Sequence, residues 1–290
     1  YMDYAATTPV DPRVFKAMKS YFSEKYGNSV SLHKEGREAK EALEQSRKTI
    51  AEMINAKPNE LIFMGSATES TNMALKGIAF ANRKKGKHIL TSSTEHHCVL
   101  EPAQWLEKQG FEITRLPVDK FGFIDTNQLE KAIRKDTILV SIMHANNEIG
   151  TIQPLGEIGR IARDTGVLFH TDAVQTAGRI PVDVDELGVV LLSISAHKLY
   201  GPKGVGALYI RRGTNIAPLL HGGSQERKMR AGTENVPGIV GLGAAAALAR
   251  RDMDAEISRL QVLRNRLLSG IRGNIRDAVL NGDEERRLPN

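Results

Sequence analysis

Two side chains with complementary chemistry follow two neighbouring apolar segments. Residues 167–173 read Val-Leu-Phe-His-Thr-Asp-Ala, and residues 193–198 read Ser-Ile-Ser-Ala-His-Lys. A lysine directly after a buried strand is costly unless its ammonium reaches water or has a chemical partner. Lys198 and Asp172 together suit pyridoxal 5′-phosphate (PLP), which offers an aldehyde to an amine and a pyridine nitrogen to an acid. For Asp172 alone, a helix cap or a turn is the simpler interpretation.

A run of small residues supplies a candidate site for the cofactor's phosphate. Residues 65–68 read Gly-Ser-Ala-Thr and connect an apolar segment to a helical pattern. The start of a helix leaves backbone N–H groups free, so Ala67 and Thr68 suit an anion. Ser195 and His197, beside the lysine, are candidates for further donors. Taken alone, the run is more simply an ordinary capped helix.

Two further segments place polar side chains after apolar strands. Residues 94–97 read Thr-Glu-His-His, and residues 145–151 read Ala-Asn-Asn-Glu-Ile-Gly-Thr. His96 could stack on the pyridine ring and move protons near neutral pH. Asn147 could bond a substrate carboxylate and the ring oxygen, although Asn-Asn also favours a turn. The paired histidines predict no metal site, because adjacent side chains of an extended segment point apart and no third ligand has suitable spacing.

Apolar segments of strand length alternate with helical patterns along most of the chain. The expected strands are residues 61–64, 88–92, 112–117, 138–143, 167–171, 189–195 and 206–210. Helices are expected from Pro12, over 35–55, 70–82, 98–109, 127–135 and 155–164, and again from Ile257. This order predicts an α/β fold with a mostly parallel seven-stranded sheet flanked by helices. The connection 196–205 is too short for a helical crossover, which favours an antiparallel final strand pair.

Composition excludes several classes of protein. Hydrophobic residues make up 41% and charged residues 26%, and the net charge of +6 comes from basic residues mixed with acidic ones. This pattern is typical of a solvated surface and predicts no nucleic-acid partner. No segment is long and apolar enough to span a membrane. The one cysteine, Cys98, excludes an internal disulfide and indicates a reducing compartment, so we expect a cytoplasmic protein.

The motifs together resemble the cysteine desulfurases, which belong to the class V aminotransferases among the fold-type I PLP enzymes. The matching stretches are Tyr4–Pro9, Gly27-Asn28, Ser66–Glu69, Glu95-His96, Asn146–Thr151, His170–Gln175, Ser195–Lys198 with Gly201–Gly204, and Arg230–Asn235. They cover nearly the whole chain in the family's order, which is far more specific than any one of them. The Arg-Ala-Gly-Thr-Glu-Asn stretch is similar to the branch that serves nitrogen fixation and general iron–sulfur cluster assembly.

The resemblance implies a role for each matching residue. Lys198 would bond the PLP aldehyde and later move protons at the substrate Cα, and His96 would stack on the ring as an acid/base. The remaining cofactor-binding residues would be Ala67, Thr68, Asn147, Asp172, Gln175, Ser195, Ala196, His197 and Thr233. Among them, Asp172 would pair with the ring nitrogen and Gln175 with the ring oxygen. Thr233 would reach the phosphate of a neighbouring subunit, which implies a homodimer with shared sites.

The resemblance also implies two domains and a longer protein. Residues 12–255 would form the PLP-binding large domain, and residues 1–11 with 256–290 part of an incomplete small α+β domain. The family's nucleophilic cysteine and its carboxylate-binding arginine have no matching positions here, and we expect the chain to be clipped at both ends. Cys98 does not match that nucleophile and is expected to be a small packing residue.

The implied reaction converts L-cysteine into L-alanine and an enzyme persulfide, with an iron–sulfur scaffold protein as the sulfur acceptor. As written, the chain supports cofactor binding and the first steps but has no matching sulfur-accepting cysteine. Three alternatives remain open: a lyase acting on selenocysteine or cysteine sulfinate, a catalytically incomplete PLP-binding partner or scaffold protein, and an α/β domain in which the motifs occur by chance, which their shared order disfavours.

Overall fold

The fold is built on one seven-stranded sheet with the strand order β1-β7-β6-β5-β4-β2-β3. The computed structural model describes all of residues 1–290. The strands are β1 Leu61–Met64, β2 His88–Ser92, β3 Glu112–Leu116, β4 Thr137–Ser141, β5 Leu168–Asp172, β6 Leu191–Ser195 and β7 Gly206–Ile210. The predicted α/β class with a mostly parallel, seven-stranded sheet is confirmed, and each strand lies within a few residues of its predicted range.

One strand, β7, runs against the rest of the sheet. β7 pairs antiparallel with both β6 and β1, whereas the pairs β2–β3, β2–β4, β4–β5 and β5–β6 are parallel. The connection from Ser195 to Gly206 holds only the short helix η3 Ala196–Lys198. A parallel neighbour would require the chain to return to the opposite end of the strands, and this connection is too short for that. The expected antiparallel pair is therefore observed.

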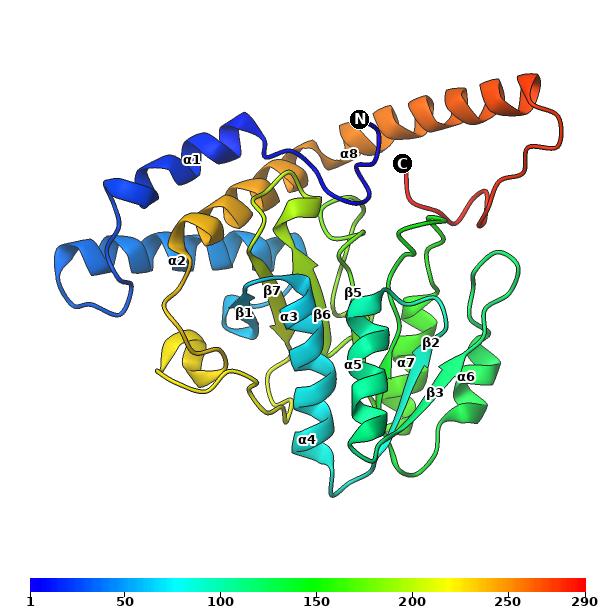
Figure 1. Cartoon of the computed structure of the whole chain (residues 1–290), viewed down its shortest axis with the longest axis horizontal. Helices are drawn as coiled ribbons and strands as arrows, with labels where there is room; N and C mark the ends of the chain where they lie inside the picture. Colours follow the sequence, from blue (N-terminus) through cyan, green and yellow to red (C-terminus); the bar gives the residue numbers. More distant parts are fainter.

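Helices cover both faces of the sheet (Figure 1). They are α1 Pro12–Ser23, α2 Lys34–Met53, α3 Ala67–Asn72, α4 Ile78–Asn82, α5 His97–Lys108, α6 Thr126–Ala132, α7 Leu155–Thr165 and α8 Val236–Asn274, with a π-helical turn η2 Met73–Gly77 between α3 and α4 and short helices η1 Pro58–Glu60 and η4 Gln225–Lys228. Leu61 and Phe63 face a core shared with α1, α2, α7 and α8, whereas Ile62 and Met64 face α3–α5. This alternation is the period-two pattern of a strand buried on both sides.

The last helix, α8, begins earlier than the sequence indicated. We expected it from Ile257, but it starts at Val236, with Asn235 as its cap and a proline in the first turn. The first half contains the Gly- and Ala-rich run 241–248, whose small residues allow α8 to lie close against α2. Small residues carry little hydrophobic periodicity, so the sequence pattern does not reveal the first half of this helix. The helix has 39 residues and runs without a break through position 255, where a domain boundary was expected.

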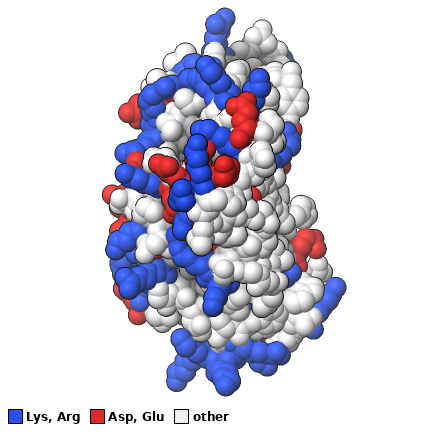
Figure 2. All heavy atoms as spheres, turned by 90° about the vertical axis from the view of Figure 1, so that its left-hand side faces the viewer, with Lys and Arg blue, Asp and Glu red and all other residues white.

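On the face in Figure 2, Lys and Arg lie among Asp and Glu over much of the surface, and a group of basic side chains lies apart from acidic ones at the lower end. None of the helices, α8 included, is both long and apolar enough to cross a membrane. The C-terminal residues fold back onto the loop after β4, where the Leu288 N–H donates to the Gly150 carbonyl at 2.9 Å.

Candidate active site

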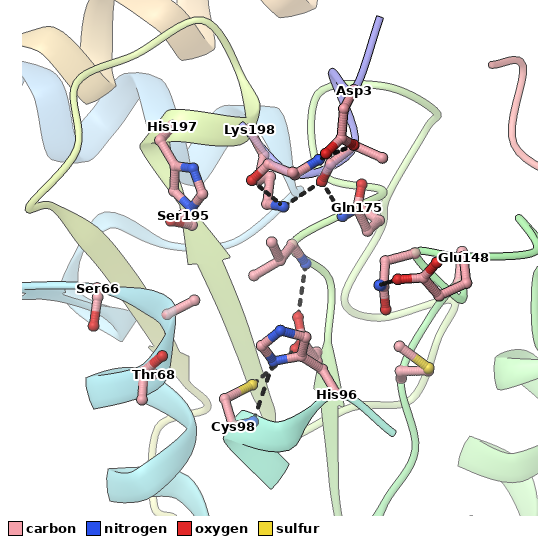
Figure 3. Close-up of a pocket in the computed structure, with 18 residues that line it drawn as sticks. Asp3, Ser66, Thr68, His96, Cys98, Glu148, Gln175, Ser195, His197 and Lys198 are labelled. Atoms are coloured by element: carbon pink, nitrogen blue, oxygen red, sulfur yellow. Dashed lines mark hydrogen bonds between the residues drawn. The ribbon is translucent and has the colours of Figure 1, made fainter. Parts of the chain in front are cut away.

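A cavity of about 680 Å³ opens at the carboxyl ends of the parallel strands (Figure 3). Nine residues predicted for the cofactor site line it: Ala67, Thr68, His96, Asn147, Asp172, Gln175, Ser195, His197 and Lys198. They come from five separate segments of the sequence, brought together because parallel strands end at the same edge of the sheet. Other residues, which were not expected there from the sequence, also line the cavity: Asp3, Ala5, Ala6, Cys98 and Glu148.

Asp172 is a buried acid at the end of β5, only 6% exposed. Its Oδ1 accepts from the Val174 N–H at 2.9 Å, and its Oδ2 lies 3.4 Å from the Cys98 sulfur. Burial raises the pKa of Asp172, and the hydrogen bond from Val174 opposes that rise. No lysine or arginine forms an ion pair with this carboxylate, so a cationic ring nitrogen would supply its missing partner.

Lys198 closes η3, directly after β6, and its side chain lines the cavity beside the N-terminal segment. Its Nζ donates to the carbonyl oxygens of Ala5 and Ala6, the second at 2.7 Å. Burial lowers the pKa of Lys198, and the nearby Arg179 lowers it further, while Asp172 acts in the opposite direction. A lysine with a lowered pKa is more often uncharged, which is the form that attacks an aldehyde.

The start of α3 presents free backbone N–H groups at the place where the sequence predicts an anion site. Ser66 caps the helix by accepting from the Glu69 N–H at 3.1 Å, and the first-turn N–H groups of Ala67 and Thr68 have no acceptor within the helix. Gly206 of β7 packs against this turn: a Cβ there would lie 2.8 Å from the Ser66 carbonyl carbon. Because position 206 has no side chain, β7 can pack directly against the turn at Ser66.

His96 caps α5 and has a defined orientation. Its Nδ1 accepts from the Cys98 N–H at 3.1 Å, so the neutral ring carries its proton on Nε2. Asn147 donates from Nδ2 to Glu148 Oε1 at 2.9 Å. Gln175 donates from Nε2 to the Ala5 carbonyl at 3.0 Å, but its buried Oε1 has no hydrogen-bond partner.

The N-terminal segment forms one wall of the cavity. The Thr8 N–H and hydroxyl both donate to the His197 carbonyl, at 3.0 and 2.8 Å. The Thr7 hydroxyl lies 3.0 Å from His197 Nδ1. These contacts hold Ala5 and Ala6 over Lys198. The sequence motif at residues 4–9 signalled this segment, but its place against the lysine was not predictable from spacing.

Two of the predicted site residues do not line the cavity. Ala196 is fully buried in η3, between Ser195 and His197, and its N–H bonds the Val205 carbonyl. Thr233 is exposed, on the segment between η4 and α8, and does not line the cavity of its own chain. The structure brings together no three His, Cys, Asp or Glu side chains that could hold a metal ion.

Comparison with known proteins places the chain in a family. The aminotransferase class-V model matches residues 1–289. "Cysteine desulfurase IscS" of Dictyoglomus turgidum is 61% identical over the whole chain, which spans 74% of that relative, and the protein of the same name from Methanosarcina thermophila is 56% identical, with 72% spanned. A solved "NifS-like protein" superposes with a TM-score of 0.97 at 44% identity, over all of this chain and 80% of the other. "SspA in complex with cysteine" gives a TM-score of 0.83 at 45% identity, over 85% of this chain and 72% of the other.

The sheet, and the lysine and acid at neighbouring strand ends, are those of fold-type I PLP enzymes. Within that class, the chain belongs to the aminotransferase class-V family. Its cofactor is PLP, and the cavity fits that molecule. Asp172 is buried without a cation, Gln175 Oε1 is buried without a donor, and Gly206 leaves the α3 turn close to β7.

Proposed function

We propose that the chain is a PLP-dependent cysteine desulfurase, which converts L-cysteine into L-alanine and passes the sulfur to a cysteine thiolate as a persulfide. One observation carries the proposal: Lys198 and Asp172 enter one cavity from the ends of the adjacent strands β6 and β5. The chain's whole length aligns with relatives named cysteine desulfurases, at 61% and 56% identity.

The side chains around the cavity suit the two ends of the cofactor. When bound, PLP supplies an aldehyde that takes up amines and a protonated ring that accepts the electron pair left at Cα. We assign Lys198 as the amine that holds the aldehyde and Asp172 as the partner of the ring nitrogen. The phosphate is assigned to Ala67, Thr68, Ser195, Ala196 and His197.

The remaining lining residues suit the substrate and the proton transfers. Gln175 is assigned to the ring oxygen through its Nε2 donor, which bonds the Ala5 carbonyl in this structure, and Asn147 is assigned to both cofactor and substrate. His96 is assigned to the face of the ring, with its Nε2 proton available for exchange. Lys198 is also assigned to the proton transfers, where its amine would remove and return the proton at the substrate Cα.

Cys98 is a poor candidate for the thiolate that takes up sulfur. Its side chain is 7% exposed, and burial together with the nearby Asp172 raises the pKa of its thiol. The thiolate, not the thiol, is the nucleophile in such chemistry. We therefore propose that the sulfur acceptor is a cysteine outside these 290 residues, which span 72–75% of the relatives described above and others like them.

The wider assembly is also a proposal. We propose a cytoplasmic homodimer in which the exposed Thr233 reaches the partner subunit's cofactor phosphate, and an iron–sulfur scaffold protein as the final sulfur acceptor. We further propose that residues 12–255 act as the large domain and that residues 1–11 and 256–290 belong to a smaller one. The exposed position of Thr233, outside its own cavity, supports the first of these.

Hydride trapping tests the central assignment. Protein incubated with PLP, reduced with borohydride and digested should carry the cofactor on the peptide that contains Lys198. The Lys198→Arg variant should retain no reducible cofactor. Lys203→Arg changes an exposed lysine of the same loop and should label like the wild type. A wild-type protein with an unmodified Lys198 would refute the proposal.

Substrate tests separate the proposed desulfurase from its alternatives. The 290-residue chain loaded with PLP should change its visible spectrum on addition of L-cysteine but release little alanine. Brisk alanine release would show that Cys98 or another group of this chain accepts the sulfur. Release of alanine from selenocysteine or cysteine sulfinate, but not from cysteine, would favour a lyase. No spectral change with any of them would favour a binding partner without catalysis.

A further inference from the structure

Cys98 contacts two of the side chains assigned to the cofactor. Its backbone N–H donates to His96 Nδ1 at 3.1 Å, and its sulfur lies 3.4 Å from Asp172 Oδ2. Both contacts are drawn in Figure 3, where Cys98 lies at the start of α5 beside His96. One residue therefore links the group assigned to the face of the ring with the group assigned to its nitrogen.

The thiol proton of Cys98 is directed toward Asp172. Burial raises the pKa of the thiol, so the sulfur keeps its single proton. The other acceptor near the sulfur is the Thr71 hydroxyl, at 3.9 Å, which is farther away and uncharged. The carboxylate is the closer and stronger acceptor, so the thiol donates to Asp172 Oδ2.

A row of buried hydrogen bonds stands behind Cys98. The Thr71 hydroxyl donates to Ser193 Oγ at 3.2 Å, and Ser193 Oγ lies 3.1 Å from His170 Nε2. The other ring nitrogen of His170 lies 2.8 Å from Ser141 Oγ. These buried polar groups therefore bond one another. Asp172 Oδ2 remains as the acceptor for the Cys98 thiol.

The same cavity contains a second sign of a ligand. Gln175 Oε1 is buried without a partner, although the Nε2 of the same side chain is satisfied. A buried acceptor of this kind costs about 1–3 kcal/mol unless a ligand or water supplies a donor. Cys98 therefore acts at the edge of a cavity built for a polar ligand.

We propose that Cys98 is a positioning residue for PLP: its thiol orients Asp172 and favours the ionised carboxylate, while its N–H sets the His96 ring. A donor to Asp172 Oδ2 stabilises the charged pair of carboxylate and pyridinium over the neutral pair. Cys98 thus helps to keep the proton on the ring nitrogen. This inference rests on the proposed function, because it requires PLP in the cavity.

A purely structural role would give a different pattern from a positioning role. A packing residue contributes by volume, so its loss would lower stability without changing the protonation of the ring. Val99, the next residue of α5, is fully buried in the core between α5 and the sheet. Val99→Ala therefore provides a matched change of buried volume on the same helix turn.

The test compares Cys98→Ala, Cys98→Ser and Val99→Ala with the wild type. PLP affinity is measured by titration of the cofactor-free protein, and ring protonation by the ¹⁵N resonance of ring-labelled PLP. Cys98→Ala should weaken PLP binding about three- to tenfold, the value of one hydrogen bond, and move the resonance toward the neutral ring. Cys98→Ser keeps a hydrogen-bond donor, so its PLP affinity and its ring ¹⁵N resonance should both lie close to those of the wild type. Val99→Ala should match the wild type in both measurements.

Two results would overturn the inference. One is a Cys98→Ala protein with wild-type affinity and resonance, and the other is a serine variant that behaves like the alanine variant. Thermal unfolding of each variant separates loss of folding from loss of binding. Failure of the wild-type protein to bind PLP would instead refute the proposed function, and the inference with it.

Discussion

At the scale of single residues, the acid and the amine of the site differ in how they are held. Asp172 has fixed donors on both oxygens, whereas Lys198 bonds only backbone carbonyls of the N-terminal segment. Residues at strand ends were predictable from sequence, because parallel strands bring their ends to one edge. Cys98 was not, because its contact with Asp172 joins residues 74 positions apart through packing of α5 on the sheet.

Burial at His170 makes stability depend on pH. The ring is fully buried between Ser141 and Ser193, and burial lowers its pKa to about 3. Below the ordinary pKa near 6.5, the unfolded chain takes up a proton that the folded chain refuses, so stability falls as pH falls. From pH 7 to pH 5 this group should lower the free energy of unfolding by about 2 kcal/mol.

Urea unfolding of the wild type and of His170→Gln at both pH values checks this effect. The variant is expected to be less stable at pH 7, because Gln cannot bond both serines in the same way. Its drop between pH 7 and pH 5 should nevertheless be smaller than that of the wild type by about 2 kcal/mol. His144, whose pKa burial lowers to about 4, is unchanged in both proteins and cancels in the comparison. Equal drops would contradict the assignment.

At the scale of elements, the strands were predictable and the start of α8 was not. Strands buried on both faces are continuous apolar runs, which end abruptly at polar residues. The first half of α8 contains small residues that meet α2 closely, and Gly243 packs on Ser46 of that helix. Two helix backbones can approach closely only where the residues between them have small side chains. Hydrophobic periodicity does not detect such residues.

Two glycines of α8 should respond oppositely to alanine. A Cβ at Gly243 would lie 2.7 Å from Ser46 Cβ, whereas a Cβ at Gly270 would meet nothing within 4 Å. Gly243→Ala should lower the free energy of unfolding by about 1–3 kcal/mol through overpacking. Gly270→Ala should raise it by up to about 1 kcal/mol, because alanine favours the helix. Denaturant unfolding of both variants measures the difference, and a stabilised Gly243→Ala would contradict the close packing.

At the scale of the whole molecule, one buried ion pair joins parts that the sequence leaves unconnected. Arg47 of α2 makes two bonds to Glu226 of η4, at 2.8 and 2.7 Å, and Glu226 Oε2 also accepts from the Phe63 N–H of β1 at 2.7 Å. Glu226 adopts φ 43°, in the left-handed region that a non-glycine residue rarely occupies. The pair fixes the segment that leads to Thr233. Strand order and such long-range pairing depend on tertiary packing, which local patterns do not contain.

Removal of this acid should be strongly destabilising. Glu226→Gln leaves the Arg47 charge buried without its main partner and should lower the free energy of unfolding by about 3–5 kcal/mol. Glu256→Gln removes an acid from an exposed pair with Arg259 on α8 and should change stability by less than about 1 kcal/mol. Chemical denaturation measures both. Similar effects of the two changes would show that burial of the first pair has little energetic weight.

The wall over Lys198 has a consequence for synthesis of the chain. Ala5 and Ala6 are made well before the lysine that they contact, which is added 193 and 192 positions later. At ordinary translation speeds the interval is on the order of 10–40 s. The segment that contains Ala5 and Ala6 therefore lacks its partner while the residues up to β6 are synthesised. The wall of the cavity can form only after Lys198 has left the ribosome.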